Sequence, residues 1–150
     1  MQSVAKRRDF LKSVGIVSVG GLLAGCSGGG SGGGPSSDAN PRDLLPDPPD
    51  GWTQGDVSQQ SAGMVGAEAG YGAGYDDEGG QYYSVEILRW SSQSDAETEG
   101  LDVYESGWSV YVVRNNFGFA GKGPDVGKVV TLLGNSSALS QGYVEENDLK

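Results

Sequence analysis

A glycine-, serine- and proline-rich segment, residues 27–50, limits what this 150-residue chain can fold into. Its first half, SGGGSGGG, has the composition of a flexible coil. Its second half contains five prolines, which stiffen and extend the backbone. We therefore expect residues 26–50 to form a tether and residues 51–150 to form one small domain, with the first tether contacts near Leu44 and Leu45.

An uncharged apolar run, residues 14–24, precedes this tether and follows four basic residues. Crossing a bilayer takes about 20 apolar residues, whereas a run of roughly this length is typical of a signal-peptide core. The alternative is a buried helix of the domain. We disfavour it because the helical pattern has no polar face and glycines follow at once.

Two short motifs flank the apolar run and carry a resemblance. KRRDFLK, residues 6–12, resembles the twin-arginine export motif, and LAGC resembles the lipobox at which lipoproteins are cleaved and lipidated. Together they make the chain similar to twin-arginine-exported lipoproteins. The residues that match the export motif are Arg7, Arg8, Phe10 and Leu11, and the lipidated residue of the lipobox is Cys26.

This resemblance implies a route and a location. It implies recognition by the twin-arginine translocase, removal of residues 1–25, and attachment to the membrane through a lipid on Cys26. The protein would then be displayed on the extracellular face of the cell membrane. Because Cys26 is the only cysteine, the chain cannot form an internal disulfide, which agrees with this reading.

The charge balance is strongly acidic. The first 25 residues hold four of the ten basic residues and one of the twenty acidic ones, so nineteen acids and six bases remain. Nucleic-acid binding needs a basic patch, so we expect no nucleic-acid partner. The lysine-poor, acidic composition resembles that of halophilic proteins, in which salt screens the repulsion between surface charges. With the export motif, this makes the chain similar to haloarchaeal surface lipoproteins.

Alternating apolar residues predict strands in the domain. QYYSVEILRW, residues 81–90, is the clearest strand, residues 62–77 form a second, and DDEGGQ supplies the turn between them. Residues 107–123 predict a further hairpin whose turn lies at Asn115 and Asn116.

Three stretches predict helices. Ser94 and Glu97 form a possible capping box for a helix that ends near Gly100. PDVGKVVTLLG predicts a helix that stops at Gly134, and residues 137–147 predict a final helical stretch. The order of elements indicates an α+β fold: a small antiparallel sheet of four or five strands with about two helices on one face.

Chemistry-bearing patterns are few. The chain has no histidine, so catalytic triads and zinc binding by imidazole are excluded. Asp76, Asp77 and Glu78 sit in a predicted turn. We interpret them as a solvated acidic turn and keep a hard-cation site, such as one for Ca²⁺, as the less favoured alternative. Asn135 begins an N-S-S glycosylation pattern. We expect no cofactor.

Aromatic and arginine residues leave two alternatives open. We expect the aromatic side chains to form the core, and any that remain exposed to form a binding face for a protein or sugar. Arg89 and Arg114 interrupt apolar strands and are expected to pair with Glu68, Glu86 or a terminal carboxylate; a bound anion is the sharper alternative. The aromatic residues considered are Trp52, Tyr82, Tyr83, Trp90, Trp108 and Tyr111.

Two functions follow from these patterns. The favoured one is a membrane-anchored surface lipoprotein whose domain is a non-enzymatic binding or interaction module. The alternative is a small extracellular hydrolase that uses carboxylates or tyrosine. A hydrolase should show a concave pocket with two converging acids of perturbed pKa, whereas a binding module should show an exposed aromatic patch without such a pair.

Overall fold

The structure, a computed structural model, describes residues 34–150, and Pro35–Lys150 form one compact unit. The elements of this unit are η1 (Pro41–Leu44), β1 (Thr53–Gln59), η2 (Ala62–Val65), β2 (Ala69–Asp76), β3 (Tyr82–Arg89), α3 (Gln93–Tyr104), β4 (Val110–Arg114), β5 (Phe117–Lys122), α4 (Val126–Gly134) and α5 (Gln141–Asn147), where η marks a 3-10 helix.

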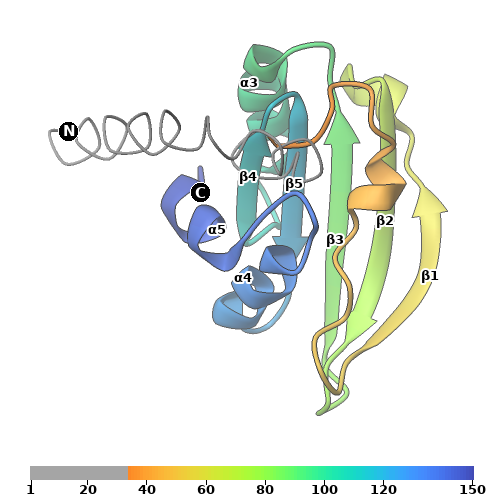
Figure 1. Cartoon of the computed structure of the whole chain (residues 1–150), viewed down its shortest axis with the longest axis vertical. Helices are drawn as coiled ribbons and strands as arrows, with labels where there is room; N and C mark the ends of the chain where they lie inside the picture. Colours follow the sequence, from red (N-terminus) through yellow and green to blue (C-terminus); the bar gives the residue numbers. More distant parts are fainter. Residues whose placement is uncertain (1–33) are drawn as a thin grey trace, which may run out of the picture. The chain divides into compact units, whose positions relative to one another are not determined.

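The strands form one five-stranded antiparallel sheet in the order β1-β2-β3-β5-β4. Two hairpins, β2–β3 and β4–β5, are joined in the sheet by the pairing of β3 with β5, and α3 connects them along the chain (Figure 1). The predicted α+β class with a small antiparallel sheet is therefore confirmed.

Both predicted hairpin turns are confirmed. In the β2–β3 turn the Asp77 N–H donates to the Gln81 carbonyl at 2.9 Å, and Gly80 has a φ of +83°. The β4–β5 turn contains Asn115 with a φ of +54°, a backbone region that asparagine tolerates better than most residues. The turn residues therefore set the register of both hairpins.

Helices cover both faces of the sheet, not one as the sequence predicts. Tyr83, Val85 and Ile87 of β3 pack with residues of α4 and α5, and we call this side the α4/α5 face. Leu88 and Trp90 pack with Ala96 and other residues of α3, and this side is the α3 face. The physical reason lies in β4, where Val110–Val113 are all buried, because a strand without a polar face needs cover on both sides.

The domain begins earlier than residue 51. Leu44, in η1, is only 7% exposed and belongs to the core of the α4/α5 face. Its carbonyl accepts a hydrogen bond of 2.6 Å from the buried Ser136 hydroxyl, and the Pro46 carbonyl accepts one of 2.7 Å from the Tyr75 hydroxyl. Residues 35–50 are therefore part of the folded unit and not a free tether, and their contacts begin earlier than the predicted start near Leu44 and Leu45.

Other element boundaries also differ from the prediction. The N-cap of α3 is Ser92, whose side chain accepts from the Asp95 N–H, and the helix runs to Tyr104 instead of ending near Gly100. The expected strand over residues 62–77 is a 3-10 turn followed by β2. The helix predicted to stop at Gly134 does so, and the final helical stretch is confirmed as α5.

Candidate functional site

One part of the sheet is not covered by any α-helix of residues 34–150. The described α-helices, α3, α4 and α5, gather at the β4–β5 end of the sheet, whereas β1, β2 and β3 extend beyond them (Figure 1). On the α3 face, helix α3 contacts β4 and β5, and only the short η2 approaches β2. The α3 face of β1–β2–β3 is therefore open to solvent along much of its length.

Three glycines of β2 form the floor of this open face. Gly70, Gly72 and Gly74 alternate along the strand, and a side chain at any of these positions would point toward the α3 face. Side chains from the two neighbouring strands lie across the space that this leaves. A Cβ at Gly72 would lie 2.8 Å from the Gln60 Nε2 and 3.1 Å from the Glu86 Cγ, so this floor accepts no larger residue without movement.

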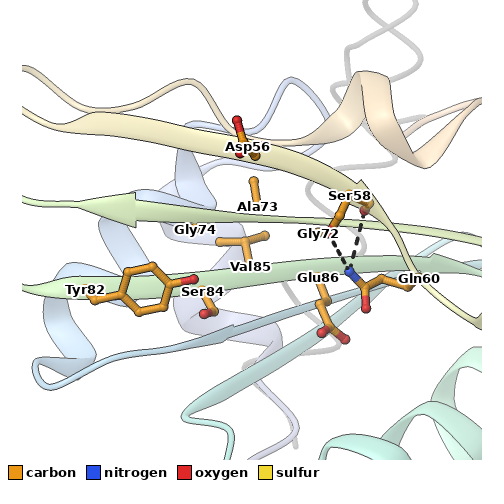
Figure 2. A pocket seen from close by; sticks show the side chains of 10 residues that line it. All are labelled: Asp56, Ser58, Gln60, Gly72, Ala73, Gly74, Tyr82, Ser84, Val85 and Glu86. Carbon is orange, nitrogen blue, oxygen red and sulfur yellow. Dashed lines mark hydrogen bonds between the residues drawn. The ribbon is translucent and has the colours of Figure 1, made fainter.

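These side chains and the glycine floor enclose a groove of about 160 Å³, which we call the glycine groove. Figure 2 shows Gln60 reaching back toward Ser58, where its Nε2 donates to the Ser58 hydroxyl at 3.3 Å. Its lining residues are Asp56, Ser58, Gln60, Gly72, Ala73, Gly74, Tyr82, Ser84, Val85 and Glu86.

Tyr82 gives the groove an exposed aromatic ring. Its side chain is 60% exposed, yet a Cβ at Gly74 would lie only 2.8 Å from the ring carbon Cζ. The ring therefore leans across Gly74 and lies against the sheet, with much of its surface open to solvent. Figure 2 shows the ring extending along β3 toward Ser84.

Glu86 lies at the other end of the groove and is held by a helix residue. The Tyr104 hydroxyl, from α3, donates to the Glu86 Oε1 at 2.9 Å. Burial, and next the neighbouring Glu86 carboxylate, raise the pKa of Tyr104, so this phenol stays protonated and remains a donor. Among the described residues Glu86 forms no ion pair with a lysine or arginine.

A more apolar hollow of about 290 Å³ adjoins the groove and shares Gln60 and Glu86 with it. Met64 of η2, which is 87% exposed, forms part of its wall. Leu88 and Val103 line it from the sheet and from α3. The open face is thus polar and aromatic at the Tyr82 end and apolar at the η2 end.

The predicted acidic turn is not arranged as a metal site. Asp77 is 5% exposed and accepts hydrogen bonds of 2.9 Å from the Gly79 and Gln81 N–H groups and from the Lys128 ammonium. Its neighbours Asp76 and Glu78 are exposed. Within residues 34–150 no group of three or more cysteine, aspartate or glutamate side chains is placed to hold a metal ion. Asp77 therefore closes a turn, and the cation alternative has no geometric support.

The other predicted site residues are dispersed. Arg7, Arg8, Phe10, Leu11 and Cys26 lie outside the described residues. Asn135 is exposed at the C-terminal end of α4, and its side-chain amide donates to the Asp47 carbonyl at 3.1 Å. Glycosylation there would have to compete with or replace this contact.

The two strand arginines do not form an anion site. Arg89 forms an ion pair of 3.4 Å with Glu68, as predicted, and also donates to the carbonyls of Asp38 and Ala39. The Arg114 guanidinium lies 4.4 Å from the centre of the Tyr143 ring. Both arginines are therefore engaged in interactions within the domain.

Most of the aromatic residues form core, as predicted, but one does not. Tyr83, Trp90 and Tyr111 are fully buried, Trp52 and Trp108 are partly buried against the core, and Tyr82 is the exposed exception. The pattern of residues 81–90 places Tyr82 on the opposite side of β3 from Tyr83, and the alternating glycines of GYGAG mark the floor beneath it. The sequence analysis did not predict the groove, because the groove forms only when β1 lies beside β2 in the folded sheet.

Comparisons with protein-family models, with curated proteins and with solved structures give no match to this chain. Within residues 34–150 none of the helices has the length and apolar character needed to cross a membrane. The glycine groove is thus defined by the geometry of the domain alone.

Proposed function

We propose that this protein is a membrane-anchored lipoprotein of the cell surface, and that its domain, residues 35–150, is a non-enzymatic binding module. In this proposal the twin-arginine translocase exports the chain, a lipid on Cys26 holds it at the extracellular face of the membrane, and the ligand is a protein or a sugar. We place it among surface lipoproteins of the haloarchaeal type, and the acidic composition supports this part of the proposal.

The observation that supports a binding role is the glycine groove. An exposed Tyr82 ring, polar side chains and an open sheet face occur together there, which is typical of a surface that recognises a partner. Such a groove needs a floor of backbone atoms without side chains, and the alternating glycines of β2 provide this floor.

The states of the acids support binding over catalysis. The pKa values of Asp38 and Asp77 are both lowered. A hydrogen bond from Ser36 lowers the pKa of Asp38, and the Gln81 backbone N–H, together with Lys128, lowers that of Asp77. A general acid needs a raised pKa, and neither residue lines the groove.

The tyrosines support the same conclusion. Burial raises the pKa of Tyr75 to about 12 and raises those of Tyr104 and Tyr111 as well. A tyrosine that acts as a nucleophile or base requires the opposite shift.

Mass spectrometry and fractionation test the location. We would express the wild type, Cys26→Ser and the nearby control Ser31→Ala in a haloarchaeal host. We expect the wild type and Ser31→Ala to be membrane-bound, to begin at Cys26 and to carry added lipid mass, and Cys26→Ser to lack that mass. A soluble, unprocessed wild type would contradict the proposed location. Hydrolytic turnover by the wild type that Glu86→Gln abolishes would contradict the proposed non-enzymatic role.

A further inference from the structure

We infer that the glycine groove binds a neutral oligosaccharide. One pyranose unit stacks on the Tyr82 ring, and neighbouring units form hydrogen bonds with the polar side chains between Tyr82 and Glu86. This inference rests on the proposed binding role and names the chemical class of the ligand.

The position of Tyr82 provides the stacking surface. Because Gly74 has no side chain, the ring can lie against the backbone of β2 instead of standing away from the sheet. An aromatic face carries partial negative charge and attracts the C–H groups of an apolar or partly apolar surface, such as one face of a pyranose. The 60% exposure of Tyr82 leaves this surface available.

Groups that donate and groups that accept hydrogen bonds lie along the groove. Ser58, Ser84 and Gln60 can each donate and accept, and Glu86 accepts only. A sugar hydroxyl also donates and accepts, so a polyol can use all of these groups. Tyr104 holds one oxygen of Glu86, which orients the carboxylate before any ligand arrives.

Charge excludes the competing small ligands. The groove is lined by the carboxylates of Asp56 and Glu86 and by no lysine or arginine, which disfavours an anion. A cation would not bind selectively in the groove, because other parts of the surface are as acidic. Helix α3 alone carries four further acidic residues and no basic one. The combination of an exposed ring with neutral polar groups therefore favours an uncharged ligand.

The length of the groove favours a chain of sugars over one. Tyr82 and Glu86 are four residues apart on one face of β3, which corresponds to about 13 Å along a strand. A single pyranose on Tyr82 would not reach Glu86 or Gln60. A linear oligosaccharide that follows β3 would reach them all.

Calorimetric titration tests the inference. The full chain is purified from its host membrane in a polyethylene glycol ether detergent, which contains no sugar, and is titrated with cellotetraose, maltotetraose and mannotetraose. Spermidine and citrate serve as cationic and anionic probes. We expect at least one tetrasaccharide to bind with similar affinity in 0.15 M and 2 M NaCl, since screening does not affect a neutral ligand.

Variants locate the binding to the groove. We expect Tyr82→Ala to weaken binding about tenfold and Tyr82→Phe about threefold, because phenylalanine keeps the ring and loses only the hydroxyl. Gly74→Ala should weaken binding as much as Tyr82→Ala, because its Cβ displaces the ring. Tyr71→Ala is the matched control, since Tyr71 lies on the other face of β2 and is also partly exposed.

Three results would overturn the inference. The first is that no tetrasaccharide binds, and the second is that Tyr71→Ala and Tyr82→Ala lose equal tetrasaccharide affinity. The third is that spermidine binds in a salt-sensitive manner while the tetrasaccharides do not bind. Spermidine binding would leave the proposed binding role intact and remove only the sugar. The location test with Cys26→Ser is independent of both.

Discussion

Asp77 shows how one residue closes a hairpin and ties it to a helix. Its buried carboxylate accepts from two N–H groups of the β2–β3 turn and from Lys128 of α4. These contacts lower its pKa, the Gln81 N–H most strongly. A carboxyl whose pKa is lower in the folded state stabilises that state above its unfolded pKa, and this contribution is lost as the pH falls through the folded pKa.

The first prediction concerns acid stability. We expect wild-type stability to fall below about pH 4, the unfolded pKa of aspartate. Asp77→Asn should be less stable at pH 7 and should lose less on acidification, because its amide does not titrate. Urea unfolding between pH 2.5 and pH 7 measures this. Glu78→Gln, at the exposed neighbour, should follow the wild type, and a parallel acid profile in Asp77→Asn would contradict the assignment.

At the scale of elements, the packing of α3 depends on a glycine within the helix. The Tyr111 side chain is fully buried and its hydroxyl donates to the Ala96 carbonyl at 2.6 Å. Gly100 of α3 and Gly118 of β5 both face this hydroxyl, and a Cβ at either position would collide with it. The missing side chains allow the helix to approach the sheet closely enough for the hydrogen bond.

The second prediction follows from this contact. Glycine-to-alanine substitution within a helix normally stabilises a protein by up to about 1 kcal/mol. We expect Gly100→Ala to destabilise by about 1–3 kcal/mol instead, because overpacking outweighs propensity. Gly142→Ala in α5, where nothing lies within 4 Å of the added Cβ, is the control and should be neutral or stabilising. Chemical denaturation of both variants decides whether the clash dominates.

The elements also show which parts of the fold were readable in the sequence. β3 and the β4–β5 turn at Asn115 were predicted because alternation and turn chemistry are local. β1 was missed because its sequence, TQGDVSQ, has almost no apolar residues, as suits an exposed edge strand with a bulge. The groove was missed for the same reason, since its wall on this side is β1 and its contacts join strands that only the folded sheet brings together.

At the scale of the whole molecule, the segment before residue 51 completes the core. Besides the contacts of Leu44 and Pro46, the Asn116 amide donates to the Ser37 carbonyl at 2.9 Å and Arg89 donates to the Asp38 and Ala39 carbonyls. Prolines and glycines suggested a free tether because composition reports local stiffness and not long-range contacts. A segment without regular structure can still supply carbonyl acceptors to buried side chains.

The third prediction tests this boundary with two fragments. A fragment of residues 51–150 would leave the Tyr75 and Ser136 hydroxyls without their carbonyl acceptors, at a cost of about 1–3 kcal/mol each. We expect it to be at least about 2 kcal/mol less stable than residues 35–150, a large share of the stability of a domain this size. Equal urea midpoints for the two fragments would restore the predicted boundary.

The last prediction concerns salt and arises from the charge of the whole molecule. Residues 34–150 contain nineteen acids and six bases, and only two ion pairs, Arg89–Glu68 and Lys128–Asp77, are present within them. Because acids outnumber bases by about three to one, the net effect of these charges is repulsion. The range of that repulsion falls from about 10 Å at 0.1 M salt to about 3 Å at 1 M.

We expect the thermal midpoint to rise on the order of 5 °C between 0.1 M and 2 M NaCl. A combined Glu97→Gln, Glu99→Gln and Asp102→Asn variant removes three of the four acids of α3 and should be more stable at low salt and less responsive to NaCl. Sucrose, which stabilises by exclusion without screening charge, should act equally on both proteins. Identical salt responses in both would mean that exclusion, and not screening, stabilises the domain in brine.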